Sequence, residues 1–372
     1  MKIILKKGDI LAVLSKIQGL TSRKSNLAIT ENVMLITNDN GITLMATDLE
    51  TGIEGSYPAV VEKEGSIAIN ARKLYEIVRE FPDDDIEINE VENKWIEIGS
   101  HDIQYHIVGM DSDEFPENPH MDEIELFEME SSFLKKMIEK STMISGATDD
   151  KRAHITGTLF ERIETGDGIC IRMVSTDGSR LSKADYYVKK DIVVPLFEKI
   201  IIPKKGLMEV AKFLSFEGTV QIGIQKTYFI AKKESETVII RLLEGEFPEY
   251  TDIIKKENRF DIKVNRAQFT MMLKRMSILS SENYKGAVFD FGGNKITVSA
   301  TNPEIGESKE DMAIDFNRDP IKVAFNPKYF IEILNAIETE NVLINIVSEE
   351  KPCVIEGEND ITYLGVIMPM RI

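Results

Sequence analysis

The sequence predicts an α+β protein made of three tandem copies of one domain, in which two helices pack on antiparallel sheets. The first observation is a strand–helix–strand segment that occurs three times, starting at Ser66, Lys199 and Lys322. The second is a further strand–helix segment upstream of each of these. The third is a strand–turn–strand segment within each copy. Because a repeat of this kind decides the whole fold, it takes precedence over any single motif.

Six segments carry apolar residues at the i, i+3, i+4 and i+7 spacing of an amphipathic helix. In the first of them, Leu11, Leu14 and Ile17 form the apolar stripe. A turn residue (Asn70, Pro203 or Asn326) precedes the second helix of each copy. The predicted helices are residues 7–17, 72–80, 132–140, 204–214, 266–276 and 327–337.

Polar turns mark corresponding places in the three copies. They lie near Asp48, Asp177 and Asn302, in the segments "LMATDLETGIEG", "MVSTDGSRLSKA" and "TVSATNPEIGES". In addition, "DEFPEN" at Asp113–Asn118 recurs as "GEFPEY" at Gly245–Tyr250. Stretches poor in apolar residues separate the copies. We therefore predict domain 1 at residues 1–124, domain 2 at 125–255 and domain 3 at 256–372.

The composition predicts a cytoplasmic protein with no membrane contact. No apolar run approaches the ~20 residues of a membrane-spanning helix, and the first residues lack the apolar core and cleavage site of a signal peptide. Cys170 and Cys353 lie far apart in the sequence, which favours two buried, reduced thiols. The net charge of −18 alone argues against nucleic acid, but only if charge is evenly distributed.

The charge is in fact unevenly distributed. The six helical segments hold 15 Lys and Arg against 6 Asp and Glu, a charge of +9, so the rest of the chain carries −18 − 9 = −27. Lys and Arg are good helix formers, but Glu is one too, and it is depleted here. If the six helices share one side, that side attracts a polyanion and every other face repels it.

The sequence contains no catalytic constellation, so we predict a protein that is not an enzyme and has no cofactor or metal. There is no Gly-rich phosphate loop, and the four histidines have no ligand-like spacing. "STDGS" around Ser179 lacks the G-x-S-x-G elbow, and Asp and Gly there suit a structural turn. An enzyme with Asp177 and Ser179 as its reactive pair is kept as an alternative.

Taken together, these features resemble the bacterial DNA sliding clamp, the beta subunit of DNA polymerase III. The motifs that carry the resemblance are "STDGSRL" (Ser175–Leu181), "EFPEY" (Glu246–Tyr250), "FNPKYFIEILNAI" (Phe325–Ile337) and "MPMR" (Met368–Arg371). The resemblance covers the whole chain. It implies three clamp domains per chain and a closed ring, formed as a head-to-tail homodimer, with helices lining the bore.

The resemblance further implies a processivity factor that encircles duplex DNA, slides without sequence specificity and tethers its partners. The expected partners are the replicative DNA polymerase, an ATP-using clamp loader and other proteins that carry a clamp-binding motif. Phosphate contacts position a protein without specifying bases, which fits sliding. An alternative of the same fold is a scaffold that binds peptides and does not encircle DNA.

In the family, partners insert a short apolar peptide between the second and third domains. Ser179 stands where many members carry a bulkier residue. Thr362–Ile367 is the predicted final strand, and the following methionines suit a surface that accepts several partners. The corresponding groove residues are Ile155, Thr176, Gly178, Ser179, Arg180, Leu181, Pro248, Ile253, Asn326, Tyr329, Pro352, Val366, Met368, Pro369 and Met370.

Two further sets follow from the resemblance. Little basic charge lies in residues 101–109, where other members often carry arginines at the dimer contact. The candidate dimer residues are Lys73, Ile278, Leu279, Glu304 and Glu307. The candidate DNA-contact residues are Arg23, Lys24, Arg72, Arg152, Lys205, Arg275 and Lys285.

Overall fold

The computed structural model describes residues 1–21, 28–100, 102–116, 118, 124–144, 152–256, 260–279 and 285–371. The chain packs as two compact units. The first consists of Met1–Lys135, Asp191–Leu196 and Lys205–Leu242. The second consists of Lys136–Lys190, Phe197–Lys204 and Leu243–Ile372. Neither unit coincides with one copy of the repeat, because strands of neighbouring copies join into continuous sheets.

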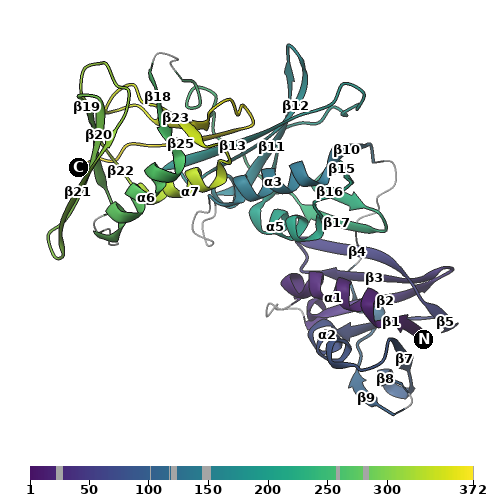
Figure 1. The fold of residues 1–372 in the computed structure, drawn as a ribbon. Helices are drawn as coiled ribbons and strands as arrows, with labels where there is room; N and C mark the ends of the chain where they lie inside the picture. Colours follow the sequence, from purple (N-terminus) through teal and green to yellow (C-terminus); the bar gives the residue numbers. More distant parts are fainter. Residues whose placement is uncertain are drawn as a thin grey trace. The chain divides into compact units, whose positions relative to one another are not determined.

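The first copy contains two helices, α1 (Lys7–Thr21) and α2 (Ala71–Glu80), which lie side by side against its strands (Figure 1). One sheet has the order β5-β1-β7-β8-β9. The other strands follow the order β6-β2-β3-β4. Their bounds are β1 (Lys2–Lys6), β2 (Asn32–Asn38), β3 (Gly41–Thr47), β4 (Thr51–Pro58), β5 (Val60–Lys63), β6 (Ser66–Asn70), β7 (Asp85–Glu90), β8 (Trp95–Gly99) and β9 (Gln104–Val108).

The second copy repeats both strand orders, as β10-β15-β16-β17 and β14-β11-β12-β13. Its main helices are α3 (Ser131–Thr142) and α5 (Lys204–Phe213), and a single turn, α4 (Ala153–Thr156), precedes β11. The strands are β10 (Leu126–Glu130), β11 (Gly157–Thr165), β12 (Gly168–Thr176), β13 (Arg180–Tyr187), β14 (Ile200–Pro203), β15 (Thr219–Gln225), β16 (Tyr228–Lys233) and β17 (Glu236–Arg241).

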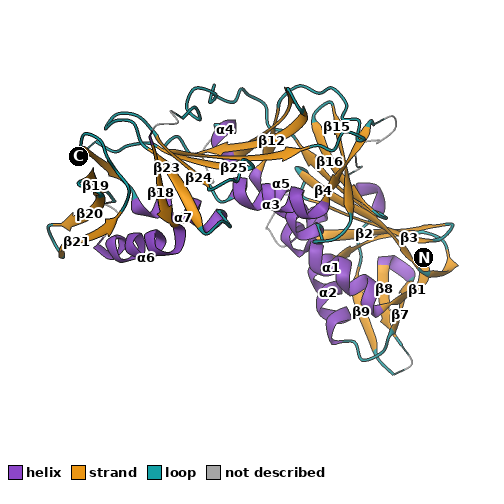
Figure 2. Ribbon diagram, turned by 45° about the horizontal axis from the view of Figure 1, so that its top comes forward, coloured by secondary structure: helices purple, strands orange, loops and turns teal. Residues whose placement is uncertain are grey.

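The third copy has the orders β18-β23-β24-β25 and β22-β19-β20-β21. Helices α6 (Arg266–Met276) and α7 (Pro327–Ala336) pack side by side against its strands (Figure 2). The strands are β18 (Asp261–Asn265), β19 (Ala287–Gly292), β20 (Lys295–Asn302), β21 (Gly306–Ala313), β22 (Ile321–Phe325), β23 (Asn341–Asn345), β24 (Cys353–Gly357) and β25 (Tyr363–Ile367).

Two antiparallel strand pairs join the copies. Pairing of β17 with β4 makes one eight-stranded sheet from copies 1 and 2, and pairing of β13 with β25 makes another from copies 2 and 3. We call these the first joint and the second joint. The three copies and their six helices, predicted from sequence, are confirmed in the described residues.

Local sequence explains where the helices begin. Asn70 and Asn326 occupy equivalent places, and each side chain accepts a backbone N–H of the first helical turn, at 3.0 Å in both cases. Such caps satisfy donors that a helix start otherwise leaves unpaired. Pro327 follows Asn326 at the position where its fixed φ suits a helix.

The predicted buried thiols are confirmed. Both cysteines are free and buried. Burial raises the pKa of Cys170 to about 11, so this thiol stays protonated and inert at neutral pH.

Candidate functional site

The second joint brings the chain's last strand beside the "STDGSRL" motif. In the antiparallel register, Arg180 faces Ile367 and Leu181 faces Val366. Beyond β25, the Met368 N–H donates to the Ser179 carbonyl at 2.9 Å. Met368, directly after the last strand, is therefore held against the turn that precedes β13.

That turn is built by its own side chains. The Thr176 hydroxyl donates to the Arg180 carbonyl at 2.7 Å, and one Asp177 carboxylate oxygen accepts the N–H groups of Ser179 and Arg180 at 3.0 and 3.1 Å. Gly178 has φ +88°, which favours glycine. These bonds give the Asp177 side chain a structural role in the turn.

Arg180 is buried at this joint rather than exposed along a groove. Its Nε donates to Asp177 at 2.9 Å, its Nη1 bonds to Glu332, and its guanidinium lies 4.2 Å from the centre of the Tyr329 ring. Glu332 and Tyr329 belong to α7. Arg180 therefore ties β13 to this helix, and half-buried Tyr329 covers it.

A buried apolar cluster includes residues of both strands of the joint, among them the predicted Leu181 and Val366. In the same compact unit, Met368 and Met370 are each 38% exposed, and Gly178, Ser179, Pro248 and Ile253 are exposed. The thioethers of Met368 and Met370 and the aliphatic side chain of Ile253 are thus accessible to solvent. The cluster consists of Leu159, Val174, Leu181, Ile201, Phe247, Tyr250, Val354, Leu364 and Val366.

The backbone carbonyl of buried Ile155 accepts a hydrogen bond from Lys204, which the sequence did not identify as part of the site. The Lys204 ammonium donates to the carbonyls of Ile144 and Ile155 at 2.5 and 2.7 Å. Burial lowers the pKa of Lys204 to about 8. This lysine therefore joins two backbone segments beside the candidate surface.

The remaining predicted surface residues take different parts. Asn326 is buried as the cap of α7. Pro352 directly precedes β24, which pairs with β25. Pro369 is half-buried, and the Met370 N–H donates to the Ala324 carbonyl at 2.8 Å. The structure therefore places all fifteen predicted residues in one compact unit.

A polar group around Tyr250 was also missed. Its hydroxyl donates to Glu161 and accepts from Arg172. The only sequence signal was the difference between "EFPEN" and "EFPEY", whose last residue changes from Asn118 to Tyr250.

Several predicted DNA-contact cations already have acidic partners within the chain. Arg72 bonds to Glu76 at 3.0 Å on an exposed helix face. The Lys205 ammonium bonds to Asp48 across the first joint, and Arg275 bonds to Glu310.

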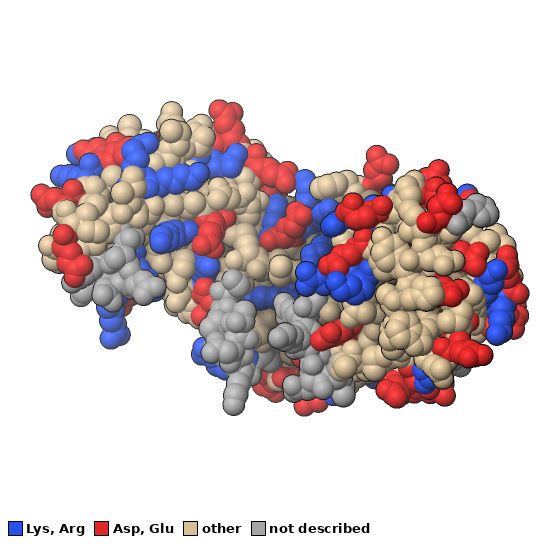
Figure 3. All heavy atoms as spheres, turned by 90° about the horizontal axis from the view of Figure 1, so that it is seen from below, with Lys and Arg blue, Asp and Glu red and all other residues tan. Residues whose placement is uncertain are grey.

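Of the other candidates, Arg152 and Lys285 are exposed, while Arg23 and Lys24 lie outside the described residues. Figure 3 shows basic and acidic side chains in small neighbouring groups on one face of the molecule. The excess of cations on the helices is thus partly offset by neighbouring carboxylates.

Four of the five predicted dimer residues, Ile278, Leu279, Glu304 and Glu307, lie near the edge strand β21. Ile278 is 74% exposed, and the Leu279 carbonyl accepts from Asn302, which precedes that strand, at 3.0 Å. Glu304 and Glu307 are exposed at the start of β21.

Lys73, on α2, is also exposed and bonds to Glu76 at 2.8 Å. Exposed pairs of this kind contribute little to stability, so this lysine can exchange partners at low cost.

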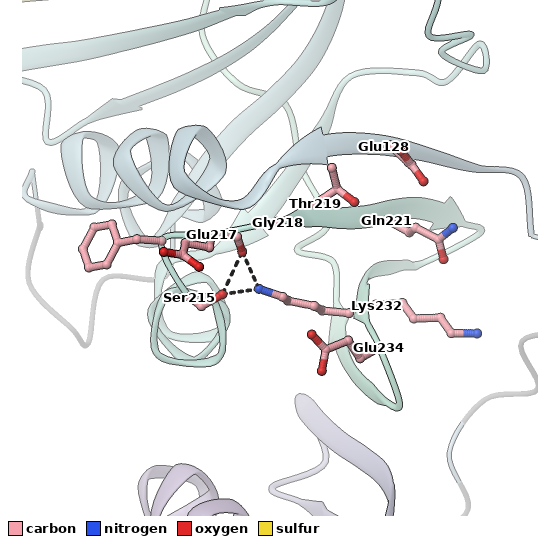
Figure 4. A pocket seen from close by; sticks show the side chains of 10 residues that line it. Glu128, Ser215, Glu217, Gly218, Thr219, Gln221, Lys232 and Glu234 are labelled. Atoms are coloured by element: carbon pink, nitrogen blue, oxygen red, sulfur yellow. Dashed lines mark hydrogen bonds between the residues drawn. The ribbon is translucent and has the colours of Figure 1, made fainter.

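A hollow of about 880 Å³ lies away from these residues, along β15 and β16 (Figure 4). The Lys233 ammonium lies across it and donates to the Glu217 carbonyl at 2.8 Å. None of the predicted site residues that the structure describes is among the residues lining this hollow. Among the described residues, no group of His, Cys, Asp and Glu is arranged to hold a metal ion, and no helix has the length and apolarity to span a membrane.

Comparisons with known proteins agree along the whole chain. Family models described as the N-terminal, central and C-terminal domains of the DNA polymerase III beta subunit match residues 1–121, 128–249 and 251–371. A beta sliding clamp from Vibrio cholerae is 27% identical over 379 residues, with 100% of both chains covered.

Solved structures are equally similar. A putative DNA polymerase III beta subunit from Eubacterium rectale has a TM-score of 0.91 at 28% identity, with 100% of both chains covered. A sliding clamp from Bartonella birtlesii, solved bound to griselimycin, has a TM-score of 0.92 at 25% identity, again with 100% of both chains covered.

Proposed function

Because the chain belongs to the DNA polymerase III beta subunit family, the bacterial sliding clamps, we propose that two copies close head to tail into a ring around duplex DNA. The chain is a processivity clamp and not an enzyme. We assign its clamp domains to residues 1–124, 125–255 and 256–372, and its place of action to the cytoplasm.

The observation that carries the ring is the strand order. In both joints, the last strand of one copy's first sheet pairs with the last strand of another copy's second sheet, as β17 with β4 and β25 with β13. The equivalent strands β9 in copy 1 and β21 in copy 3 each have one neighbour among the described strands. A second chain offers each of them the missing partner.

The repeat also predicts the register of this third joint. Within the chain, Ile240 faces Thr51 at the first joint, and Ile367 faces Arg180 at the second joint. The equivalent positions are Ile107 on β9 and Ile305 before β21. Ile305 is 63% exposed, and Ile107 is half-buried. We therefore infer that these two isoleucines meet across the interface, so that apolar contact replaces the ion pairs of the inner joints.

Electrostatics supports DNA in the bore. The six predicted helical segments carry +9 while the remainder carries −27. A cationic lining with exchangeable partners, such as Arg72 and Arg275, attracts phosphates without holding them at one base step. Closure of the ring, rather than affinity, then keeps the protein on DNA.

The surface at the second joint is the proposed partner groove. Met368, Met370 and Ile253 present exposed apolar groups, and the same compact unit contains the buried apolar cluster. Such a surface fits a short apolar peptide. The proposed occupants are segments of the replicative polymerase, the clamp loader and other partner proteins.

Retention on DNA tests encirclement. The protein is loaded onto nicked circular DNA by a clamp loader and followed by gel filtration at moderate salt. We expect retention on the circle and rapid loss once the circle is cut once. Equal retention on circular and linear DNA contradicts the ring.

Assembly state separates the ring from a non-encircling scaffold of the same fold. Sedimentation at micromolar concentration should show a dimer, because a ring needs two chains. The variant Ile305→Asp, at the predicted third joint, should sediment as a monomer with an unchanged circular dichroism spectrum. A wild-type monomer under these conditions favours the scaffold.

A further inference from the structure

One wall of the proposed groove is a segment without regular strand structure, residues 243–254. Phe247 and Tyr250 are its anchors, both buried, with their rings in edge contact at 6.2 Å. The exposed Pro248 and Ile253 belong to the same segment. The Ile253 N–H donates to the Tyr250 carbonyl at 2.9 Å, so a backbone hydrogen bond links Ile253 to Tyr250.

Tyr250 is held by a chain of polar contacts over three strands. Its hydroxyl donates to Glu161 on β11 and accepts from Arg172 on β12 at 3.4 Å. Arg172 is fixed in turn by two bonds to Asp185 on β13, at 2.7 and 2.9 Å. Asp185 also accepts from Lys183 at 2.6 Å. Paired donors of this geometry are strong and directional.

Packing alone leaves this wall room to move. An open pocket of about 290 Å³ lies between this segment and strands β11 and β12. It is lined by Leu159, Glu161, Ile163, Arg172, Lys199, Phe247, Pro248, Glu249, Tyr250 and Thr251. Because apolar contact is non-directional, a segment beside such a space can shift without losing all its burial. The hydrogen bonds of the Tyr250 hydroxyl are directional, so they fix the orientation of this side chain where packing alone does not.

The repeat provides an internal control. By strand register, the positions of Glu161, Arg172 and Asp185 in copy 2 correspond to Ile36, Thr43 and Ser56 in copy 1. The place of Tyr250 in the "EFPE" motif is taken by Asn118.

Copy 3 has Asp290, Thr297 and Asp311 at the same three positions, again without an arginine. The full set of charged partners therefore occurs in copy 2, whose wall faces the proposed groove.

From this we propose that Tyr250, held by Glu161 and the Arg172–Asp185 pair, is a positioning residue that sets the wall of the partner groove. This inference rests on the proposed function, since it concerns the same groove. Tyr250 acts through Pro248 and Ile253, which would touch the peptide.

Griselimycin, which binds the Bartonella birtlesii clamp, is the probe. Tyr250→Phe removes only the hydroxyl and should weaken griselimycin binding about tenfold, the worth of one to two hydrogen bonds. Glu161→Gln should weaken it less, because a neutral acceptor remains. The matched control is Tyr187→Phe, which removes an exposed hydroxyl from β13 of the same sheet and should leave affinity unchanged.

A double-mutant cycle separates positioning from a general structural effect. If Tyr250 acts through the wall, Tyr250→Phe should cost less than about twofold in an Ile253→Ala background. An unchanged affinity of Tyr250→Phe overturns the inference, as does the same tenfold loss in both backgrounds. If the wild-type protein does not bind griselimycin, the proposed partner groove is contradicted. Ring closure is tested separately, by retention on circular DNA.

Discussion

The two joints inside the chain use the same backbone contacts and different side chains. At the first joint the Arg241 N–H donates to the Glu50 carbonyl at 2.8 Å, and at the second the Met368 N–H donates to the Ser179 carbonyl at 2.9 Å. The strand register around both contacts is equivalent. The two joints therefore have the same main-chain pairing.

The side chains around these contacts diverge. The first joint is secured by Lys16 with Glu236, at 2.6 Å, and by Lys205 with Asp48. In the second joint, Lys140 lies 5.1 Å from the centre of the Tyr363 ring, at the place equivalent to Lys16 and Glu236. At this one place the first joint has an ion pair and the second has a cation–aromatic contact.

The turn and the segment after the joining strand differ in the same sense. Leu49, Glu50 and Arg241 at the first joint correspond to Gly178, Ser179 and Met368 at the second. Small residues and a thioether leave an accessible apolar surface, whereas a charged pair of side chains does not. The shared joint is thus a scaffold, and the choice of a few side chains makes one copy of it suited to binding.

The largest expected effect is on peptide binding at the second joint, when the end of the chain is removed. Deletion of Met368–Ile372 removes the methionines and the bond to Ser179, while β25 remains complete. We expect griselimycin affinity to fall more than about 100-fold, since apolar contacts and one wall are lost together. Calorimetric titration measures the affinity, and circular dichroism should show an unchanged fold. Unchanged affinity contradicts the groove assignment.

Stability should distinguish the joints next. Arg180→Ala removes the ion pairs to Asp177 and Glu332 and should lower the free energy of unfolding by about 2–4 kcal/mol. Lys205→Ala at the first joint should cost about 1 kcal/mol, because the Lys205 side chain is partly exposed and Asp48 keeps its bonds to the N–H groups of Glu50 and Thr51. Urea denaturation measures both. A larger cost for Lys205→Ala shows that the first joint depends more on its ion pairs than the second.

The smallest effect concerns Lys204 and pH. Its pKa is about 8 in the folded protein and near 10.5 when unfolded, so between these values the unfolded chain binds more protons. Stability must then rise with pH across that window. We expect the wild-type protein to gain about 2 kcal/mol more than Lys204→Met between pH 8 and 10. Parallel pH profiles in urea denaturation contradict a buried, partly neutral lysine.

Much of the fold follows from the sequence because its signals are local and repeated. Apolar spacing alone located six helices, and Asp48, Asp177 and Asn302 each accept the N–H of a residue two positions later, as polar turns should. The pairing of β17 with β4 was not predictable from such patterns. It depends on which sheet edges meet, and edge residues have no periodic signature.

Side-chain pairing was the weakest part of the sequence prediction. Counting charges on helices treats Lys205 and Arg275 as free, yet their partners come from Asp48 and Glu310 in other elements. The contacts of Tyr250 are likewise spread over three strands. Such groups become visible only when the tertiary structure places the strands side by side.

The repeated joint also bears on the shape of any assembly. A head-to-tail contact can close on itself or run on without end, and the rotation between successive copies decides which. Two of the three rotations that a closed pair requires lie inside the chain, at β17 with β4 and β13 with β25. A substitution that changed the angle at either place would leave the outer edges intact and turn closed pairs into open filaments.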